Sequence, residues 1–538
     1  MFDVAILGSG MSGSILGAIL ARQQLRVVIL DSKAHPRFAV GESTIPHTSI
    51  LLSVLAQRYG VPELHNLGLA SPGGIRNAIG PTCGIKRTFA FAYHAPDCEH
   101  DPRQALQFGS AFRDENHLFR QDVDAYLLRV AILYGVTAVQ NAKVTALDIN
   151  RDGVVLELGN GERLHARFLV DGTGHDSVLA QRLGLREEPT RLAHHSRSVF
   201  THMINVEPFE NTVPNLLSIP WSQGTLHHVF ERGWIWVIPF NNNPWSTNPL
   251  VSVGLTIDPR RYPKTDLPPE KEFSDFIQLF PSVARQFKNA KAVRPWVSTG
   301  RLQYSSTRTL GQRFCLMSHA AGFVDPLYSR GLINTMEVLY GLIEPLLAAL
   351  REDDFSEERF ASLERTQQKV IDYADRVVNA SFISWSDFDL WNAWFRVWAV
   401  GTASAEATLS NALSDFSNSG DLSFLAGDID DPVFSTFEDP GYASLFDCAA
   451  RQVEAFERGE VSAPAATESI LTLLRRSYRL FRDEVVAKGL QWALSNATSR
   501  DIHVGHPHLQ QRWLARQPDQ HLVSPPSFLA DPLSMGRR

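Results

Sequence analysis

The sequence predicts a mixed α/β fold (α/β with α+β features) made of a Rossmann-like nucleotide-binding unit, an antiparallel sheet and a helical C-terminal region. A glycine-rich loop follows the first apolar run, residues 234–239 have an aromatic strand pattern, and helical spacing dominates after residue 350. The chain has 538 residues, more than the roughly 250–300 at which one core stops growing. We therefore expect one unit over 1–350 with an inserted antiparallel sheet over 190–310, and a mainly helical capping region over 351–538.

The N-terminal segment has the pattern of a strand–helix–strand unit with a dinucleotide-binding turn. Residues 2–7 and 26–30 have the composition of buried strands, and residues 14–22 that of the helix between them. Three glycines suit a tight turn, close approach to a pyrophosphate and packing of helix on strand: Gly8, Gly10 and Gly13. Asp31 follows the second strand, where a carboxylate can bind a ribose hydroxyl. The unit predicts dinucleotide binding and leaves the dinucleotide open.

Charge and composition argue against several classes of function. The net charge is −7 and no dense basic tract occurs, so neither a nucleic acid nor an anionic membrane is an expected partner. The four cysteines are scattered, as in a protein of a reducing cytoplasm, and no histidine cluster has metal-ligand spacing. No apolar run reaches the ~18 residues of a membrane span. We expect a cytoplasmic protein that acts on a small molecule without a metal.

Three further segments favour FAD as the dinucleotide. Residues 37–46 combine a flexible glycine with hydrogen-bonding side chains, as needed beside a ring system: Gly41, Glu42 and Ser43. Residues 169–177 look like the Asp-Gly fingerprint of flavin monooxygenases, here Asp171 and Gly172. Residues 313–323 resemble the segment that approaches the flavin ribityl chain in that superfamily, although His319 stands where Asp is usual.

The pattern F-x-x-P-x-x-S-x-G over residues 323–331 makes the resemblance specific. Together with W-x-W-x-I-P at 234–239 and Gly-Glu-Ser-Thr-Ile-Pro at 41–46, it resembles the FAD-dependent halogenases, and within them the phenol-type enzymes. The likeness covers most of the chain to about residue 410. It implies the flavin-monooxygenase fold and adds further cofactor-binding candidates: Arg120, Phe323 and Pro326.

The resemblance also implies a reaction scheme. Reduced FAD, O2 and a halide ion, chloride or bromide, give hypohalous acid, which travels through the protein to a lysine beside the substrate. The halide would bind backbone N–H groups of a glycine-containing turn, since consecutive amides form an anion-binding concavity. The turn consists of Ser329, Arg330 and Gly331. A separate NAD(P)H-dependent flavin reductase would supply the FADH2.

The aromatic strand is the expected wall between flavin and substrate. Alternation along a strand places Trp234, Trp236 and Ile238 on one face, before Pro239. An ordinary core strand would show the same pattern, because large aromatics dominate cores. Beside the halide turn and a lysine, shielding of the flavin becomes the preferred interpretation.

Lys86, in Cys-Gly-Ile-Lys, is the expected catalytic lysine. Strict alternation places it on a face of small residues and turns Phe89 away from it, unless the strand is bulged. An ammonium held out of water has a lowered pKa, and the neutral amine can take up the oxidant. For an arbitrary lysine, a solvated strand edge would be the better interpretation.

Tyr328 directs the substrate prediction. Tryptophan halogenases have a glutamate there that assists the lysine and helps take the ring proton. Because base assistance contributes ~10²–10⁴-fold, its absence at this place favours an activated phenolic ring over tryptophan, with a pyrrole or carrier-bound substrate still open. By resemblance, the pocket would include Phe89, Tyr328 and Ser404.

Two rival functions remain open at this stage. An aromatic hydroxylase of the same fold would form product without halide, and a flavin-binding redox sensor would form none. The sequence does not set the oligomeric state, and a homodimer is one assembly that it allows.

Overall fold

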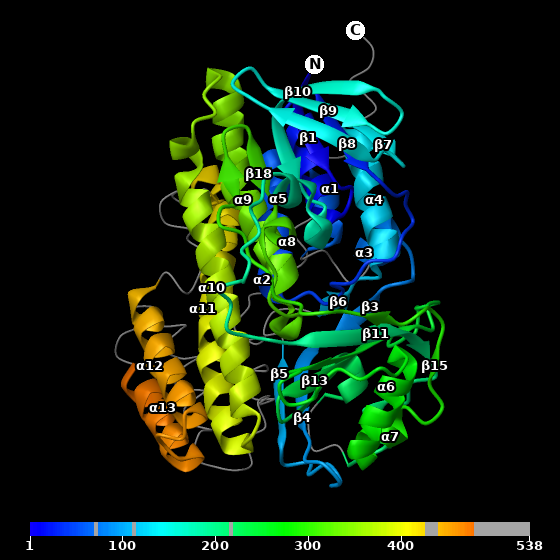
Figure 1. Cartoon of the computed structure of the whole chain (residues 1–538), viewed down its shortest axis with the longest axis vertical. Helices are drawn as coiled ribbons and strands as arrows, with labels where there is room; N and C mark the ends of the chain where they lie inside the picture. The colour runs from blue at the N-terminus through cyan, green and yellow to red at the C-terminus, as the bar shows by residue number, and fades with distance from the viewer. Residues whose placement is uncertain (69–73, 110–113, 215–218, 426–438, 478–538) are drawn as a thin grey trace.

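The computed structural model describes residues 1–68, 74–109, 114–214, 219–425 and 439–477. Figure 1 shows two sheets one above the other and long helices along one side of both. The fold is the predicted mixed α/β type. The expected helical structure beyond residue 477 lies outside the described residues.

The upper sheet is the nucleotide-binding layer, and its central strands are parallel. Its order is β17-β18-β10-β1-β2-β7, with the β8–β9 hairpin attached to β10. The bounds are β1 Phe2–Leu7, β2 Val27–Asp31, β7 Thr137–Gln140, β8 Val144–Ile149, β9 Val154–Leu158, β10 Arg163–Asp171, β17 Leu310–Gly311 and β18 Phe314–Leu316. The first two strands match the predicted ones within a residue.

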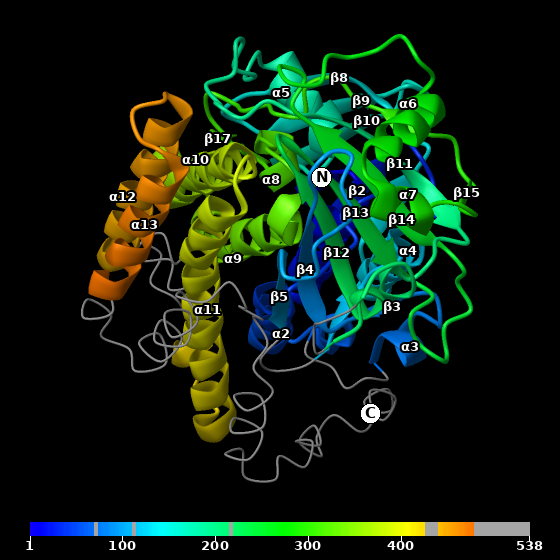
Figure 2. The same ribbon diagram turned by 90° about the horizontal axis from the view of Figure 1, so that it is seen from below.

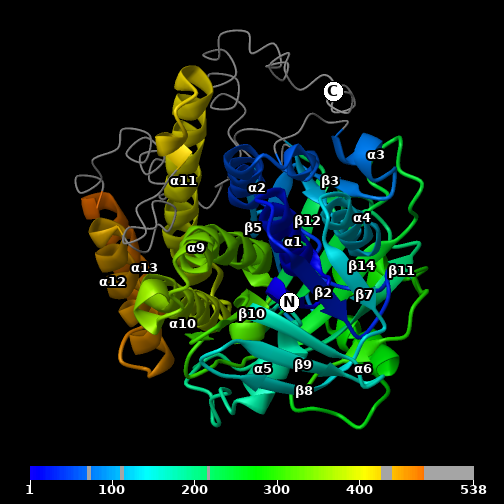
Figure 3. The same ribbon diagram turned by 90° about the horizontal axis from the view of Figure 1, so that it is seen from above.

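Helices α1 and α4 pack together beside this sheet, as Figure 3 shows from above. The expected first helix begins three residues earlier than predicted, at Met11, directly after the glycine turn. The helices of the first 330 residues are α1 Met11–Arg22, α2 Pro46–Tyr59, α3 Gly74–Ala78, α4 Arg120–Leu133, α5 Val178–Arg182, α6 Pro269–Phe276, α7 Pro281–Gln286 and α8 Ser318–Ala321.

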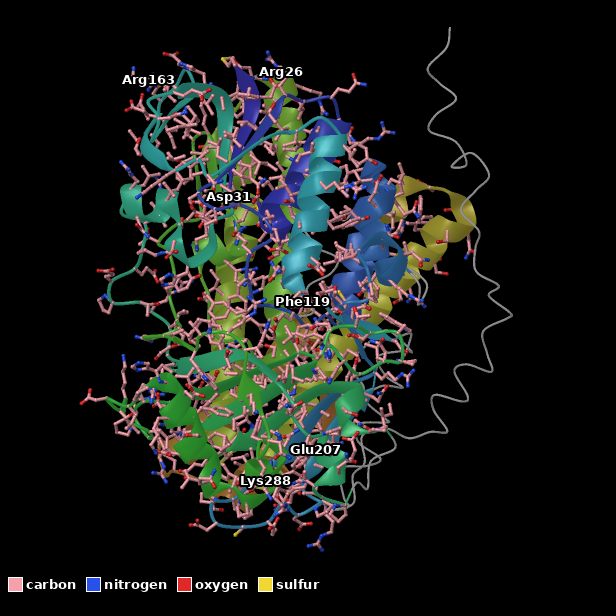
Figure 4. The ribbon with its side chains drawn as sticks, turned by 90° about the vertical axis from the view of Figure 1, so that its right-hand side faces the viewer. Arg26, Asp31, Phe119, Arg163, Glu207 and Lys288 are labelled. Carbon is pink, nitrogen blue, oxygen red and sulfur yellow. The ribbon has the colours of Figure 1, made fainter. Side chains whose placement is uncertain are left out.

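The carboxyl ends of the parallel strands face the gap between the two sheets. Figure 4 labels Arg26 at the outer end of β2, Asp31 at its inner end, and Phe119 between the layers. Ligands of open α/β sheets bind at such carboxyl ends. The glycine turn and Asp31 therefore lie on the side of the upper sheet that faces the second sheet.

The lower sheet contains the aromatic strand at its centre. Its order is β15-β11-β14-β13-β12-β4-β5, with β16 paired to β11. The bounds are β4 Thr88–Tyr93, β5 Ala105–Gly109, β11 Arg197–Ile204, β12 Gly224–Phe230, β13 Gly233–Pro239, β14 Val251–Ile257, β15 Lys291–Ala292 and β16 Val297–Ser298. The sheet is antiparallel over 190–310, as expected. It recruits β4 and β5 from outside that range, however, and β4 runs parallel to β12.

Four long helices follow residue 329 and flank both layers. They are α9 Arg330–Glu352, α10 Ala361–Ser384, α11 Phe388–Ser419 and α12 Pro440–Glu457, followed by α13 Ala463–Ser477. Seen from below, α11 runs alongside β4 and β5 (Figure 2). Its tryptophans Trp391, Trp394 and Trp398 are buried in one core with residues of the lower sheet.

One helical stretch of the described chain, Leu327–Glu352, is long and apolar enough by composition to cross a membrane. Two thirds of its most apolar window is buried inside the protein (67%), which is the pattern of a core helix.

Candidate active site

The glycine turn is shaped for a phosphate group. Gly8 has φ +92°, and a Cβ there would lie 2.7 Å from the Gly172 oxygen. A Cβ on Gly13 would lie 2.0 Å from the Gly8 oxygen, so neither position has room for a side chain. Gly10 caps α1 without a side-chain hydrogen bond, and a Cβ there would meet nothing within 3.8 Å. The first N–H groups of α1 have no side-chain cap from Gly10, and a helix start of this kind fits the FAD pyrophosphate.

Asp31 is held as a carboxylate at the end of β2. Burial alone would raise its pKa, but hydrogen bonds from the Ser9 side chain and the Ser9 and Lys33 backbone, together with the charge of Arg37, hold the pKa below its usual value. The Arg37 guanidinium lies 3.1 Å from one carboxylate oxygen. An ionised carboxylate here can accept a hydrogen bond from a ribose hydroxyl.

The loop at residues 41–43 is fastened from two sides. Arg120 forms an ion pair with Asp124 (2.7 Å) and donates hydrogen bonds to the carbonyls of Val40 and Gly41 at 2.7 and 3.1 Å. The Glu42 carboxylate lies 2.7 Å from the His202 ring. Arg120 and Glu42 therefore position this loop, whatever contact its backbone makes with a flavin.

Asp171 and Gly172 support the glycine turn from behind. The buried Asp171 carboxylate accepts a hydrogen bond from the Thr173 N–H at 2.9 Å and from the Leu179 N–H at 2.8 Å. It also accepts one from Ser177 Oγ at 2.8 Å. Gly172 packs on Gly8, so this pair shapes the turn.

The turn predicted to bind the halide, called the halide turn below, has an unusual backbone. Tyr328 and Ser329 are both left-handed, with φ 66° and 53°, an arrangement that costs energy for residues other than glycine. The long helix α9 begins at Arg330 without a side-chain cap, so the N–H groups of its first turn have no intrahelical partner. Gly331 abuts His319, since a Cβ there would lie 2.8 Å from its ring. Such a turn favours an anion.

Phe323 and Pro326 frame this turn on the preceding segment. Phe323 pairs with Tyr304 in an isolated bridge, and its ring packs near the His319 ring, 5.6 Å between centroids. Pro326 is αR and accepts a hydrogen bond from the Ser329 N–H.

The aromatic strand presents its two indoles on one face, as alternation predicts. Trp234, Trp236 and Ile238 belong to one apolar core, and their neighbours Ile235 and Val237 to another. The two indole centroids are 5.6 Å apart. Trp236 lies across Gly254, which has no side chain to obstruct it, and donates to Ser252 Oγ at 3.1 Å.

Lys86 ends the short strand β3 (Gly84–Lys86) and is buried. Its amine donates hydrogen bonds to Ser43 Oγ and to the Thr44 carbonyl, both at 2.8 Å. Burial lowers the pKa of Lys86 to about 7, although Glu115 and Glu406 pull in the opposite direction. The amine is therefore substantially neutral at physiological pH, as predicted for the catalytic lysine.

The expected orientation of Phe89 is wrong. The strand is interrupted at Arg87, between β3 and β4, so alternation does not continue through it. As a result, the Lys86 nitrogen lies 4.4 Å from the centre of the Phe89 ring, and both line one pocket.

A chain of hydrogen bonds runs from Lys86 to the aromatic strand. Ser43 Oγ lies 2.9 Å from Thr225 Oγ1, which lies 2.9 Å from His117 Nε2. His117 Nδ1 lies 2.8 Å from the Pro239 carbonyl, which can only accept, and burial holds the pKa of His117 near 3. The ring therefore carries its proton on Nδ1, and each hydroxyl donates toward His117. Ser43 consequently accepts from Lys86, and the lone pair of the neutral amine stays free.

The pocket in front of Lys86 is small, and three aromatic side chains are part of its lining. Its volume of about 20 Å³ holds roughly one water molecule, so an aromatic ring enters when side chains move apart. It is lined by Ile45, Pro46, Lys86, Arg87, Thr88, Phe89, Phe108, Glu115, Trp398, Thr402 and Glu406. Of the three predicted pocket residues, only Phe89 lines it. Tyr328 stacks behind on Trp398 (4.4 Å), and Ser404 lies on α11 outside the lining.

Two buried carboxyl groups in this lining escaped sequence analysis. Glu115, on β6 (Glu115–His117), pairs with Lys86 in the strand register and accepts hydrogen bonds from Ser49 and Thr44 at 2.6 and 2.8 Å. Burial raises the pKa of Glu406, on α11, to about 8. A hint was present: Glu406 is the sole charged residue between Arg396 and Asp415.

Among the described residues, no group of three or more His, Cys, Asp or Glu side chains is arranged to hold a metal ion. The buried histidines His94 and His228 bond to each other at 2.9 Å. They serve packing in the lower sheet.

Comparison with known proteins defines the class. The chain is 45% identical to tetracycline 7-halogenase from Kitasatospora aureofaciens over 88% of its own length and 87% of that protein. It is 46% identical to monodechloroaminopyrrolnitrin halogenase PrnC from Pseudomonas fluorescens, covering 88% and 84%. The solved structure of halogenase PltM with phloroglucinol and FAD matches with a TM-score of 0.86 and 36% identity, over 92% of this chain and 99% of that one. The protein is a flavin-dependent halogenase.

The chain belongs to the tryptophan halogenase family, whose profile matches residues 3–63 and 90–396. Its cofactors are FAD in reduced form, O2 and a halide ion. Enzymes of this class act on small substrates and receive FADH2 from a separate flavin reductase. The likeness to phenol-type halogenases inferred from the sequence is confirmed by the match to PltM.

Proposed function

We propose that the protein halogenates an electron-rich phenolic ring by hypohalous acid that forms at the flavin and is relayed to Lys86. Reduced FAD, when bound, supplies with O2 the oxidising power for this step. The N–H groups around Ser329, Arg330 and Gly331 hold the halide. The face of Trp234 and Trp236 separates the flavin from the ring.

The observation that carries the proposal is the Lys86 amine in a pocket that three aromatic side chains help to line. Two N–H groups of the neutral amine are engaged by Ser43 and Thr44, so its lone pair remains free for an electrophilic halogen. Phe89, Phe108 and Trp398 offer ring faces for stacking of a flat substrate. PltM, whose structure was solved with phloroglucinol, supports a phenol.

The absence of a carboxyl group at Tyr328 no longer supports a phenol by itself. Glu406 and Glu115 place carboxyl groups beside Lys86 from other elements. The phenol proposal therefore depends on the aromatic lining and on the likeness to PltM.

The test is a panel of phenols, phloroglucinol included, incubated with the protein, a flavin reductase, FAD, NADH and either chloride or bromide. Mass spectrometry should show replacement of ring hydrogen by halogen only when halide is present. Free tryptophan and pyrrole-2-carboxylate, free or carrier-bound, serve as comparison substrates. Hydroxylated product without halide, or halogenation of tryptophan in preference to every phenol, would contradict the proposal.

A further inference from the structure

Glu406 is a buried carboxyl group in the pocket wall. Its side chain projects from α11, is 3% exposed, and lines the same cavity as Lys86 and Phe89. Its Oε1 has no hydrogen-bond partner among the described residues. Leaving a buried polar atom unpaired costs about 1–3 kcal/mol. In a pocket wall, such an oxygen is a candidate for contact with a bound molecule.

The surroundings of Glu406 favour its acid form. The ionisable groups that line the cavity with it are Lys86, Arg87 and Glu115. Arg87 is paired with Asp114 at 3.1 Å, and Glu115 is bound by the Ser49 and Thr44 hydroxyls. Burial, reinforced by Glu115 and opposed by Lys86, raises the pKa of Glu406 to about 8. At neutral pH the side chain is mostly a carboxylic acid with a proton to give.

Tyr328 is unable to serve in this way. Its hydroxyl bonds Ser381 Oγ at 2.7 Å, and its ring is packed under Trp398. Glu115 is held differently, because its Oε2 accepts hydrogen bonds from Ser49 and Thr44. Glu406 Oε1 is a buried oxygen of this lining that has no hydrogen-bond partner among the described residues.

We propose that Glu406 is the acid–base catalyst of ring halogenation. As a ring carbon takes the halogen from hypohalous acid, the O–X electron pair stays with oxygen, and the Glu406 acid protonates that oxygen so that water leaves. The resulting carboxylate then removes the proton from the halogenated ring carbon, which restores the aromatic ring and the acid form. The sum is Ar–H + HOX → Ar–X + H2O. The proposal rests on the role of Lys86 given above.

The main test compares Glu406→Gln with Asp415→Asn, an acid-to-amide change on the exposed part of the same helix. We expect halogenated product per FADH2 oxidised to fall about 10²–10⁴-fold in Glu406→Gln, and to stay unchanged in Asp415→Asn. The amount of hypohalous acid captured by an external trap should increase in Glu406→Gln. A ring-deuterated phenol should react more slowly than its hydrogen form in Glu406→Gln and equally fast in the wild type. Wild-type product yield in Glu406→Gln would overturn the proposal.

A second readout needs no turnover. Infrared difference spectra at pH 7 should show a protonated carboxyl band in the wild type that is missing in Glu406→Gln. Circular dichroism confirms that both variants are folded. If the wild type halogenates no phenol, the substrate proposal fails, whereas absence of the carboxyl band overturns the role of Glu406.

Discussion

The Lys86 amine has two properties that an amine in water lacks at neutral pH. It is substantially neutral, and its N–H groups have a fixed direction. Burial supplies the first, because it lowers the pKa to about 7. The acceptors Ser43 and Thr44 supply the second. Both are needed if the amine is to capture a small oxidant.

Replacing Lys86 with Met keeps the length of the side chain and removes the amine. We expect halogenation to be abolished while oxidation of FADH2 continues, because the amine acts after the oxidant forms. Product by mass spectrometry and flavin oxidation by absorbance check this, with Lys86→Ala as a second variant. Surviving halogenation in both variants would exclude the role of Lys86.

Thr225→Val removes the middle hydroxyl of the chain between Ser43 and His117. Ser43 then lacks its acceptor and is free to donate to the Lys86 lone pair, so we expect halogenation to fall roughly five- to tenfold, the effect of one hydrogen bond of ~1 kcal/mol. Thr145→Val, an exposed threonine on β8, is the control. Equal rates in the two variants would show that the chain does not orient the amine.

At this scale the sequence could predict residues whose role is local. The glycines of the first turn act through their own backbone, and Lys86 is marked by its short motif. Glu406 could not be predicted, because it meets Lys86 only after α11 packs beside β4.

Among the elements, strands β13 and β14 meet at one closely matched pair of residues. Trp236 on β13 and Gly254 on β14 are register partners, and a Cβ on Gly254 would lie 2.1 Å from the indole. The position of the Trp236 indole therefore requires a glycine on the neighbouring strand.

Gly254→Ala should displace the Trp236 indole. Overpacking of this kind costs about 1–3 kcal/mol, so the melting temperature should fall. Oxidant escape, measured with an external trap, should increase because the wall is disturbed. Gly159→Ala is the control, since its Cβ would lie an ordinary 3.7 Å from the nearest atom. Unchanged coupling of oxidant to product would argue against the wall.

Alternation predicted the β13 face correctly and failed between Lys86 and Phe89. In β13 the pairing is regular on both sides. Between β3 and β4, Arg87 donates its N–H to the Gln223 carbonyl instead of extending either strand. Nothing local in the sequence marks this interruption.

At the scale of the whole molecule, the helices after residue 329 connect the two layers. Helix α9 starts at the halide turn and packs against α1 and α2, whereas α11 closes the pocket. The fold class follows from the sequence because each part has its own pattern. The recruitment of β4 and β5 into the lower sheet depends on long-range pairing and was not predictable.

The variant Glu337→Gln tests whether the pKa of the buried Glu337 carboxyl group on α9 is raised. Burial raises the pKa of Glu337 on α9 to about 7, with Arg330 opposing. Between pH 4.5 and 7 the folded protein thus binds a proton that the unfolded chain has lost, and wild-type stability decreases as pH rises. His47, 3.5 Å away, has a pKa near 3 and stays neutral in this range.

The variant does not titrate there, so its melting temperature relative to the wild type should rise from pH 4.5 to 7 and then level off. The full difference is at most about 3 kcal/mol, from 1.36 kcal/mol per pKa unit. Calorimetry across this range measures it, with Asp415→Asn as a control expected to show no such trend. A flat difference for Glu337→Gln would contradict a raised pKa.

The Pro239 carbonyl gives the strand β13 two duties at once. In the proposed function its tryptophans shield the flavin, and its last carbonyl orients the Lys86 amine through His117, Thr225 and Ser43. A shift of β13 that displaced these tryptophans would also disturb the hydrogen bonds that orient the Lys86 amine. Release of oxidant and its uptake at Lys86 should therefore change together. A variant that releases more oxidant through a displaced β13 should also halogenate less.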